Sequence, residues 1–133
     1  MGERFKNWKK PIIEDRVLHP KYNFLVHYKD NLELGEKTDI GAFTYINAKH
    51  GVIIKKDVQI GSHCSIYSHS TIDDKKGKVV IKENARIGTH SVIMPGVTIG
   101  KNSVIGAFSF VNKDIPDNAI AVGIPARIKG ESK

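Results

Sequence analysis

The sequence predicts an all-β solenoid made of short strands joined by tight turns. An aliphatic residue recurs every six positions and opens thirteen segments between Leu34 and Val111. The second position of six of these segments is glycine, and the fifth is usually a small residue. A period of six excludes an amphipathic helix, whose apolar residues recur every three or four positions, and it is too regular for hairpins of variable length.

Each six-residue segment, or hexad, is expected to form one short strand and one turn. Its first and fifth side chains point inward, and the glycine occupies a corner where a Cβ would clash. The register slips twice, by two residues around 51–53 and by three within 73–80. The first positions are Leu34, Ile40, Ile46, Ile54, Ile60, Ile66, Ile72, Ile81, Ile87, Ile93, Ile99, Ile105 and Val111.

The chain divides into three parts along its length. Residues 1–33 carry no hexads and are predicted to cap the first coil. Residues 34–116 are predicted to form the solenoid, with a loop at 73–80, and residues 117–133 to form a C-terminal tail. Apolar contacts from the cap to the first coil are expected from Phe5, Trp8, Ile12, Ile13, Val17 and Leu18.

Composition sets limits on location and partners. The length of 133 residues suits one domain. No apolar run approaches the roughly 18 residues that a membrane-spanning helix needs, and the N-terminus lacks the apolar stretch of a signal peptide. We therefore expect a soluble, cytoplasmic protein. The single cysteine, Cys64, excludes an intrachain disulfide.

Basic residues exceed acidic ones by 21 to 14, and seven of them lie between Arg4 and Lys29. This excess favours anionic partners. A phosphorylated small molecule fits this excess as well as nucleic acid does. No nucleic-acid-binding motif accompanies the excess, and no nucleic-acid partner is expected.

Residues 34–129 resemble the hexapeptide-repeat acyltransferases, in particular the galactoside and maltose O-acetyltransferase or sugar-antigen acetyltransferase branch. The most specific part is IGTHSVIMPGVTIGKNSVIGAFSFVNKDIPDNAIAVGIPARI, at 87–128, which is similar to the ending of that family. The resemblance implies a left-handed parallel β-helix of four to five triangular coils. It also implies acetyl-CoA as co-substrate, and a homotrimer with active sites between its subunits.

Four histidines are sorted by the repeat register. His63, His69 and His90 hold the fourth, outward position of their hexads, whereas His50 falls at a fifth, inward position and is expected to be a packing residue. The spacing of His69 and His90, one coil plus the three inserted positions, places them one above the other on one face, with His63 on the preceding face.

His69 is the best candidate for a general base. It lies four residues before the stretch at 73–78, and loops on rigid scaffolds often carry function. In the resembled branch the catalytic histidine also precedes an extended loop, although that branch has a Gly-His pair where this chain has Ser68-His69. An imidazole with a pKa near 6.5 is suited to taking a proton from an acceptor at neutral pH. His90 remains the alternative base.

Direct acyl transfer is expected because Cys64 occupies an inward position and no nucleophile motif is present. Backbone N–H groups near Gly88 or Gly106 are candidate donors to the oxyanion. For coenzyme A, the resemblance implies backbone contacts from Thr89 and Ala107, and phosphate contacts from Lys113, Arg127 and Lys129.

Other side chains are candidates for orienting the base or binding the acceptor. Asp73 or Asp74 would orient His69 or bind an acceptor amine, unless the DDKK stretch pairs with its own lysines. Tyr67 would stack on a sugar or cover the neighbouring subunit. His63 and His90 are further candidates for contact with the acceptor.

The leading hypothesis is an acetyl-CoA-dependent O- or N-acyltransferase acting on a sugar or amino sugar, with nucleotide-linked sugars included, and with no metal. One alternative is a γ-type carbonic anhydrase that holds zinc through three histidines across a subunit boundary, for which His63, His69 and His90 are available. The other is a non-catalytic β-helix scaffold.

Overall fold

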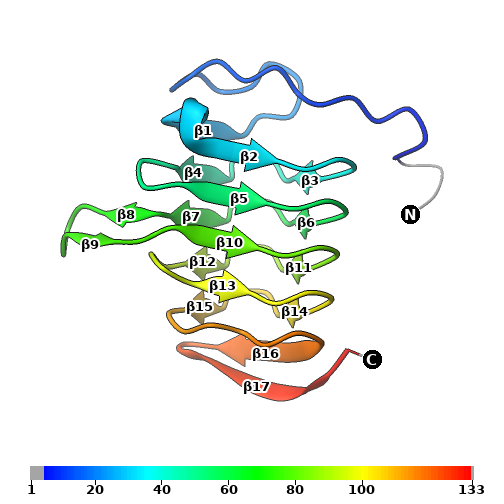
Figure 1. The fold of residues 1–133 in the computed structure, drawn as a ribbon, viewed down its shortest axis with the longest axis vertical. Coiled ribbons are helices and arrows are strands. Elements are labelled where there is room, and N and C mark those ends of the chain that lie inside the picture. The colour runs from blue at the N-terminus through cyan, green and yellow to red at the C-terminus, as the bar shows by residue number, and fades with distance from the viewer. Residues whose placement is uncertain (1–4, 133) are drawn as a thin grey trace.

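The computed structural model describes residues 5–132 and shows a left-handed parallel β-helix, in which three faces of short strands stack along one axis (Figure 1). Face 1 contains β1 (Leu25–His27), β4 (Tyr45–Asn47), β7 (Ser65–Tyr67), β12 (Val92–Ile93) and β15 (Phe110–Val111). Face 2 contains β2 (Leu32–Leu34), β5 (Val52–Ile54), β10 (Val79–Ile81) and β13 (Thr98–Ile99). Face 3 contains β3 (Asp39–Ile40), β6 (Gln59–Ile60), β11 (Arg86–Ile87), β14 (Val104–Ile105) and β16 (Ala119–Gly123).

Other elements depart from this parallel stacking. A short 3-10 helix, η2 (Lys29–Asn31), joins β1 to β2. The hairpin of β8 (His69–Ser70) and β9 (Lys75–Lys76) projects beyond the column (Figure 1). At the C-terminal end, β17 (Ala126–Glu131) pairs antiparallel with β16 and closes face 3.

The core is a narrow column of aliphatic side chains, as the repeat predicts. Equivalent isoleucines of successive coils pair in register, for example Ile46 with Ile66 and Ile66 with Ile93. Small fifth-position side chains such as Ser91 and Ser103 are fully buried between them. Ile72 is the exception among the predicted first positions, because its side chain is 96% exposed.

The reason for the Ile72 error is the length of the inserted segment. On face 1, Tyr45 pairs with Ser65 and Val92 pairs with Phe110, but Ser65 pairs with Val92, which lies much further along the chain. The coil that contains the insertion is therefore longer, by one whole hexad, than the repeat count implies. The hexad that begins at Ile72 leaves the column and forms part of the projecting hairpin.

The corner between faces 2 and 3 is held by an asparagine ladder. Asn84, Asn102 and Asn118 all adopt left-handed backbone conformations, which asparagine tolerates better than most residues. The Asn84 side-chain amide donates to Asn102 Oδ1 at 2.9 Å, and Asn102 donates in turn to Asn118 Oδ1 at 3.2 Å. This ladder ties three coils together.

The N-terminal part covers the first coil only in part. Phe5 is buried, and the indole N–H of Trp8 donates to the Thr38 carbonyl at 2.9 Å. Ile12, Val17 and Leu18 are exposed, so the expectation that they pack on the coil is wrong. Parallel pairing begins at Leu25, before the first recognisable hexad.

None of the helical segments within residues 5–132 has the length and apolar character that a membrane crossing requires.

Candidate active site

His69 lies at the start of the β8–β9 hairpin, where the chain leaves face 1. Its side chain is only 11% exposed, and its Nε2 lies 3.1 Å from Oδ1 of Asp74, on the far side of the hairpin turn. The Lys76 ammonium lies 3.6 Å from the same carboxylate oxygen. The hairpin thus brings a base, a carboxylate and a cation together within a short stretch of chain.

Asp74 is held in its ionised form by these two neighbours. The hydrogen bond from His69 is the largest cause lowering the pKa of Asp74, and the charge of Lys76 adds to it. The pKa of Asp73 is also lowered, chiefly by a side-chain hydrogen bond from Ser70, and the Lys75 ammonium lies 3.9 Å away. Of the two candidate carboxylates, Asp74 contacts His69 and Asp73 does not, while both also pair with the neighbouring lysines.

His50 lies beside His69, and the sequence analysis missed this contact. The two imidazole rings meet edge to face, with centroids 5.3 Å apart. His50 is exposed rather than inward, because the two residues added at this corner carry it out of the column. Partial desolvation and then the nearby His69 lower the pKa of His50. One feature of the sequence could have revealed the contact between His50 and His69: both register slips fall at the same corner of successive coils.

Ser68 fixes the backbone that carries both rings. Its hydroxyl is fully buried, donates to the Asn47 carbonyl at 2.7 Å, and accepts from the backbone N–H of His50 at 2.9 Å. One side chain therefore links the corner that presents His50 to the strand that leads into His69.

His63 and His90 occupy a different corner, between faces 3 and 1. Their rings are parallel, with centroids 4.7 Å apart; Phe108 stacks on His90, and Phe43 meets His63 at a tilt. The prediction that His90 lies over His69 is wrong, because the extra hexad in the coil between them aligns His90 with His63 instead.

A hydrogen-bond chain fixes the tautomer of His90. The Thr89 hydroxyl donates to the Ser62 carbonyl at 2.8 Å, so it must accept from Nδ1 of His90, 2.9 Å away. The neutral ring then carries its lone pair at Nε2.

Thr89 and Ala107 lie one above the other at this same corner. Within residues 5–132, the backbone N–H groups of both have no backbone acceptor, so they are available to a ligand. The N–H groups of Gly88 and Gly106 are not, because they donate to Ile105 and Ala121 at 2.8 Å. Of the N–H groups near these two glycines, those of Thr89 and Ala107 are therefore the candidate oxyanion donors that stay open, and the N–H groups of the glycines themselves are engaged.

One chain does not bring all the predicted site residues together. His69 follows β7, at the C-terminal end of the face 1 strands, whereas Thr89 and Ala107 precede β12 and β15, at the N-terminal end. Lys113 is exposed just after β15. Arg127 and Lys129 are exposed on β17.

Two other predicted residues have structural partners. Tyr67 ends β7, and its ring lies 5.8 Å from that of Tyr45 in the preceding coil. Cys64 is buried in the column, donates its thiol to the Gly88 carbonyl at 3.3 Å, and has its pKa raised by burial. The thiol is therefore a core group, as its repeat position predicts.

No three His, Cys, Asp or Glu side chains within residues 5–132 form a group able to hold a metal ion.

Known proteins with this architecture identify the family. The family description "Bacterial transferase hexapeptide (six repeats)" matches residues 78–113. A hexapeptide-repeat-containing acetyltransferase from Vibrio cholerae has the same fold, with a TM-score of 0.74 and 30% identity, over 83% of this chain and 68% of its own. The chain belongs to the hexapeptide-repeat transferase family.

Two further relatives place this hexapeptide transferase near the galactoside acetyltransferases. The galactoside O-acetyltransferase of Lactococcus lactis is 38% identical over 110 residues, which cover 71% of this chain and 53% of the relative. A galactoside acetyltransferase solved in complex with coenzyme A has a TM-score of 0.75 and 34% identity, over 83% of this chain and 60% of its own. The chain thus spans about half the length of its Lactococcus relative.

Proposed function

We propose that this hexapeptide transferase moves an acetyl group from acetyl-CoA to a hydroxyl or amino group of a sugar, with His69 as the general base. The observation that carries the proposal is the His69–Asp74 pair on a hairpin projecting from a rigid column. Relatives named galactoside O-acetyltransferase, and neighbours solved with coenzyme A and acetyl-CoA, support the donor and the acceptor class.

The contact between His69 and Asp74 supports one proton path. Asp74 accepts a hydrogen bond from Nε2–H, so the neutral His69 ring carries its lone pair at Nδ1. Nδ1 takes the proton of the acceptor as its oxygen or nitrogen attacks the thioester carbonyl. The tetrahedral intermediate then collapses, the carbon–sulfur bond breaks, and the imidazolium returns the proton to the departing thiolate.

Asp74 is a positioning residue in this scheme. Its carboxylate stabilises the imidazolium that forms during the transfer, and Lys76 keeps that carboxylate ionised. The His50 ring meets that of His69 edge to face, and we propose that His50 contacts the acceptor.

Acetyl-CoA is proposed to run along the corner of Thr89 and Ala107, whose free N–H groups suit the amide carbonyls of the pantetheine arm. The exposed cations Lys113, Arg127 and Lys129 suit its phosphates. Because this corner and His69 lie at opposite ends of face 1, we propose that a second copy of the chain unites them, as a closed trimer would do with one repeated contact.

Thiol release from acetyl-CoA in the presence of hydroxyl sugars, amino sugars and nucleotide-linked sugars tests the reaction. Mass spectrometry of the product, with mild alkaline treatment, separates an O-acetyl ester from an N-acetyl amide. Sugar-dependent thiol release supports the proposal, and its absence with every acceptor, together with no acetyl-CoA binding by calorimetry, contradicts it.

Complementation between two inactive variants tests the shared site. His69→Ala removes the base, and Ala107→Trp blocks the proposed pantetheine path. If sites form between copies, random mixing restores about a quarter of the sites, because each needs one intact group from each neighbour. No recovery in mixed oligomers would show that each site lies within one copy.

A further inference from the structure

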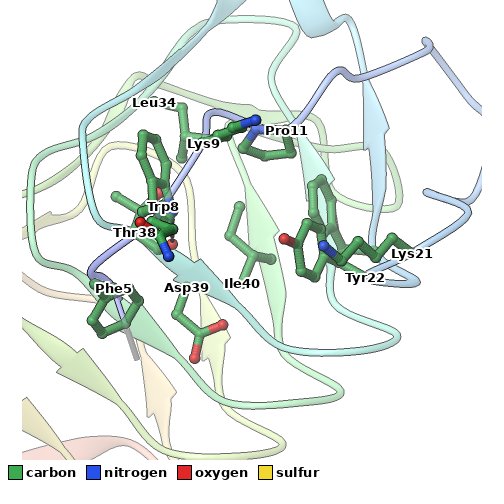
Figure 2. A pocket seen from close by; sticks show the side chains of 12 residues that line it. Phe5, Trp8, Lys9, Pro11, Lys21, Tyr22, Leu34, Thr38, Asp39 and Ile40 are labelled. Carbon is green, nitrogen blue, oxygen red and sulfur yellow. Dashed lines mark hydrogen bonds between the residues drawn. The ribbon is translucent and has the colours of Figure 1, made fainter. Parts of the chain in front are cut away.

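A cavity of about 720 Å³ lies between the N-terminal segment and the first coil. Figure 2 shows Phe5 and Trp8 on one side of it, Tyr22 and Lys21 on the other, and Ile40 between them. The coil contributes Leu34, Thr38 and Ile40, which are all buried.

The size and lining of this cavity suit a small molecule with a flat ring. Small-molecule sites typically have volumes of about 300–1,000 Å³ and are lined by apolar and aromatic side chains with a few polar groups. Four aromatic residues, Phe5, Trp8, Tyr22 and Phe24, line this one. Trp8 is held in place by its hydrogen bond to the Thr38 carbonyl, so its ring is a fixed wall.

The polar lining of the cavity combines two cations, Lys9 and Lys21, with Asn7, Thr38 and one carboxylate, Asp39. Lys9 and Lys21 both line the cavity and are exposed, and the Lys21 ammonium lies 5.1 Å from the centre of the Tyr22 ring. They belong to the basic cluster between Arg4 and Lys29. The proposed acetyl-CoA residues lie on later coils and at the C-terminal end, so they do not account for this cluster.

We propose that this cavity binds a nucleoside diphosphate, with the base among the aromatic rings and the phosphates beside the ammonium groups of Lys9 and Lys21. The proposal goes beyond the acetyl transfer, because the cavity lies on the first coil near the corner between faces 2 and 3, away from both His69 and Thr89. A free nucleotide and the nucleotide part of a nucleotide-linked sugar share this chemistry.

The protein carries its own reporter for this cavity, since Trp8 is the only tryptophan in the sequence. Its emission is followed during titration with UDP, ADP, a UDP-linked sugar, uridine and inorganic phosphate. We expect a saturable change with the diphosphates, roughly ten-fold weaker binding of uridine, and no change with phosphate. If the UDP-linked sugar binds as tightly as UDP, the ligand of the cavity is a nucleotide-linked sugar. If the UDP-linked sugar binds much more weakly than UDP, the ligand is the free nucleotide.

Matched variants locate the binding. Replacing both lysines, Lys9→Ala with Lys21→Ala, is expected to weaken UDP binding roughly ten-fold or more. Lys10→Ala removes an adjacent exposed lysine that does not line the cavity and is expected to leave binding unchanged. Tyr22→Ala, at an exposed position, removes one aromatic wall and weakens binding without threatening the fold.

Three results would overturn the proposal: no saturable change with UDP or ADP, undiminished binding in the double lysine variant, or emission that changes on dilution without nucleotide. The last would show that a second copy of the chain fills the cavity. These readouts do not depend on acetyl transfer, so an inactive acetyltransferase and an empty cavity are separate outcomes.

Discussion

The Asp74 carboxylate lies 3.1 Å from Nε2 of His69, although a tight turn separates the two in sequence. The antiparallel pairing of β8 with β9 sets this distance, because His69 is registered with Lys76 and Ser70 with Lys75. The hairpin turn then places Asp74 against the imidazole. The contact is made within the hairpin, whose base Ser68 anchors to the preceding coil.

The pH behaviour of Asp74 tests this contact. Because the pKa of Asp74 is lowered in the folded protein, the contribution of its ionised carboxylate to stability is present above the ordinary aspartate value of about 3.9 and is lost as the pH falls through the lowered pKa. We expect His69→Ala to raise the pKa of Asp74 more than Lys76→Ala does, as followed by carboxyl-carbon NMR. The pKa of Asp73, whose main partner is Ser70, is the internal control and should be unchanged in His69→Ala. A larger effect of Lys76→Ala would show that the histidine is not the main partner.

Ser68 is predicted to stabilise the corner through its buried hydroxyl. Ser68→Ala leaves the His50 N–H without its acceptor and the Asn47 carbonyl without its donor, which is expected to cost about 1–3 kcal/mol in the free energy of unfolding. Ser65→Ala, at a half-buried position on β7, the strand just before Ser68, should change the free energy of unfolding by about 0.5 kcal/mol or less. Urea denaturation measures both, and equal effects would argue against the hydrogen-bond account.

The period of six predicts the column well for a physical reason. Each hexad buries its first and fifth side chains in the same geometry, so one rule covers every coil. The same regularity conceals the hairpin, because Ile72 keeps the spacing of a buried residue while its hexad projects outward. A periodic pattern cannot distinguish a short insertion from a longer one when the difference between them is a whole hexad.

The repeat pattern also limits how much of the candidate site can be predicted from the sequence. The sequence predicts His69 as the base and Asp73 or Asp74 as its partner, but the choice of Asp74 follows from the hairpin turn. The error in coil length also separates His90 from His69 and pairs it with His63. His50 is missed because the two added residues turn a position counted as inward toward solvent.

The close stacking of coils at the glycine corners gives a further prediction. A Cβ on Gly88 would lie 2.5 Å from the Ala107 backbone nitrogen, whereas a Cβ on Gly130 would meet nothing within 4 Å. Gly88→Ala is therefore expected to lower the free energy of unfolding by about 1–3 kcal/mol or more, because backbone must move to admit the methyl group. Gly130→Ala should be close to neutral. Thermal denaturation distinguishes them, and similar melting temperatures would contradict the packing.

The acetyl-transfer rate of His69→Ala, measured beside His50→Ala on an accepted sugar, tests the central claim most directly. We expect His69→Ala to lose about 10²- to 10⁴-fold in kcat while its affinity for acetyl-CoA, measured by calorimetry, stays unchanged. His50→Ala should change KM for the acceptor more than kcat, because His50 is proposed to contact the acceptor without taking its proton. Full activity in His69→Ala, or a loss confined to His50→Ala, would contradict the assignment of His69 as the base.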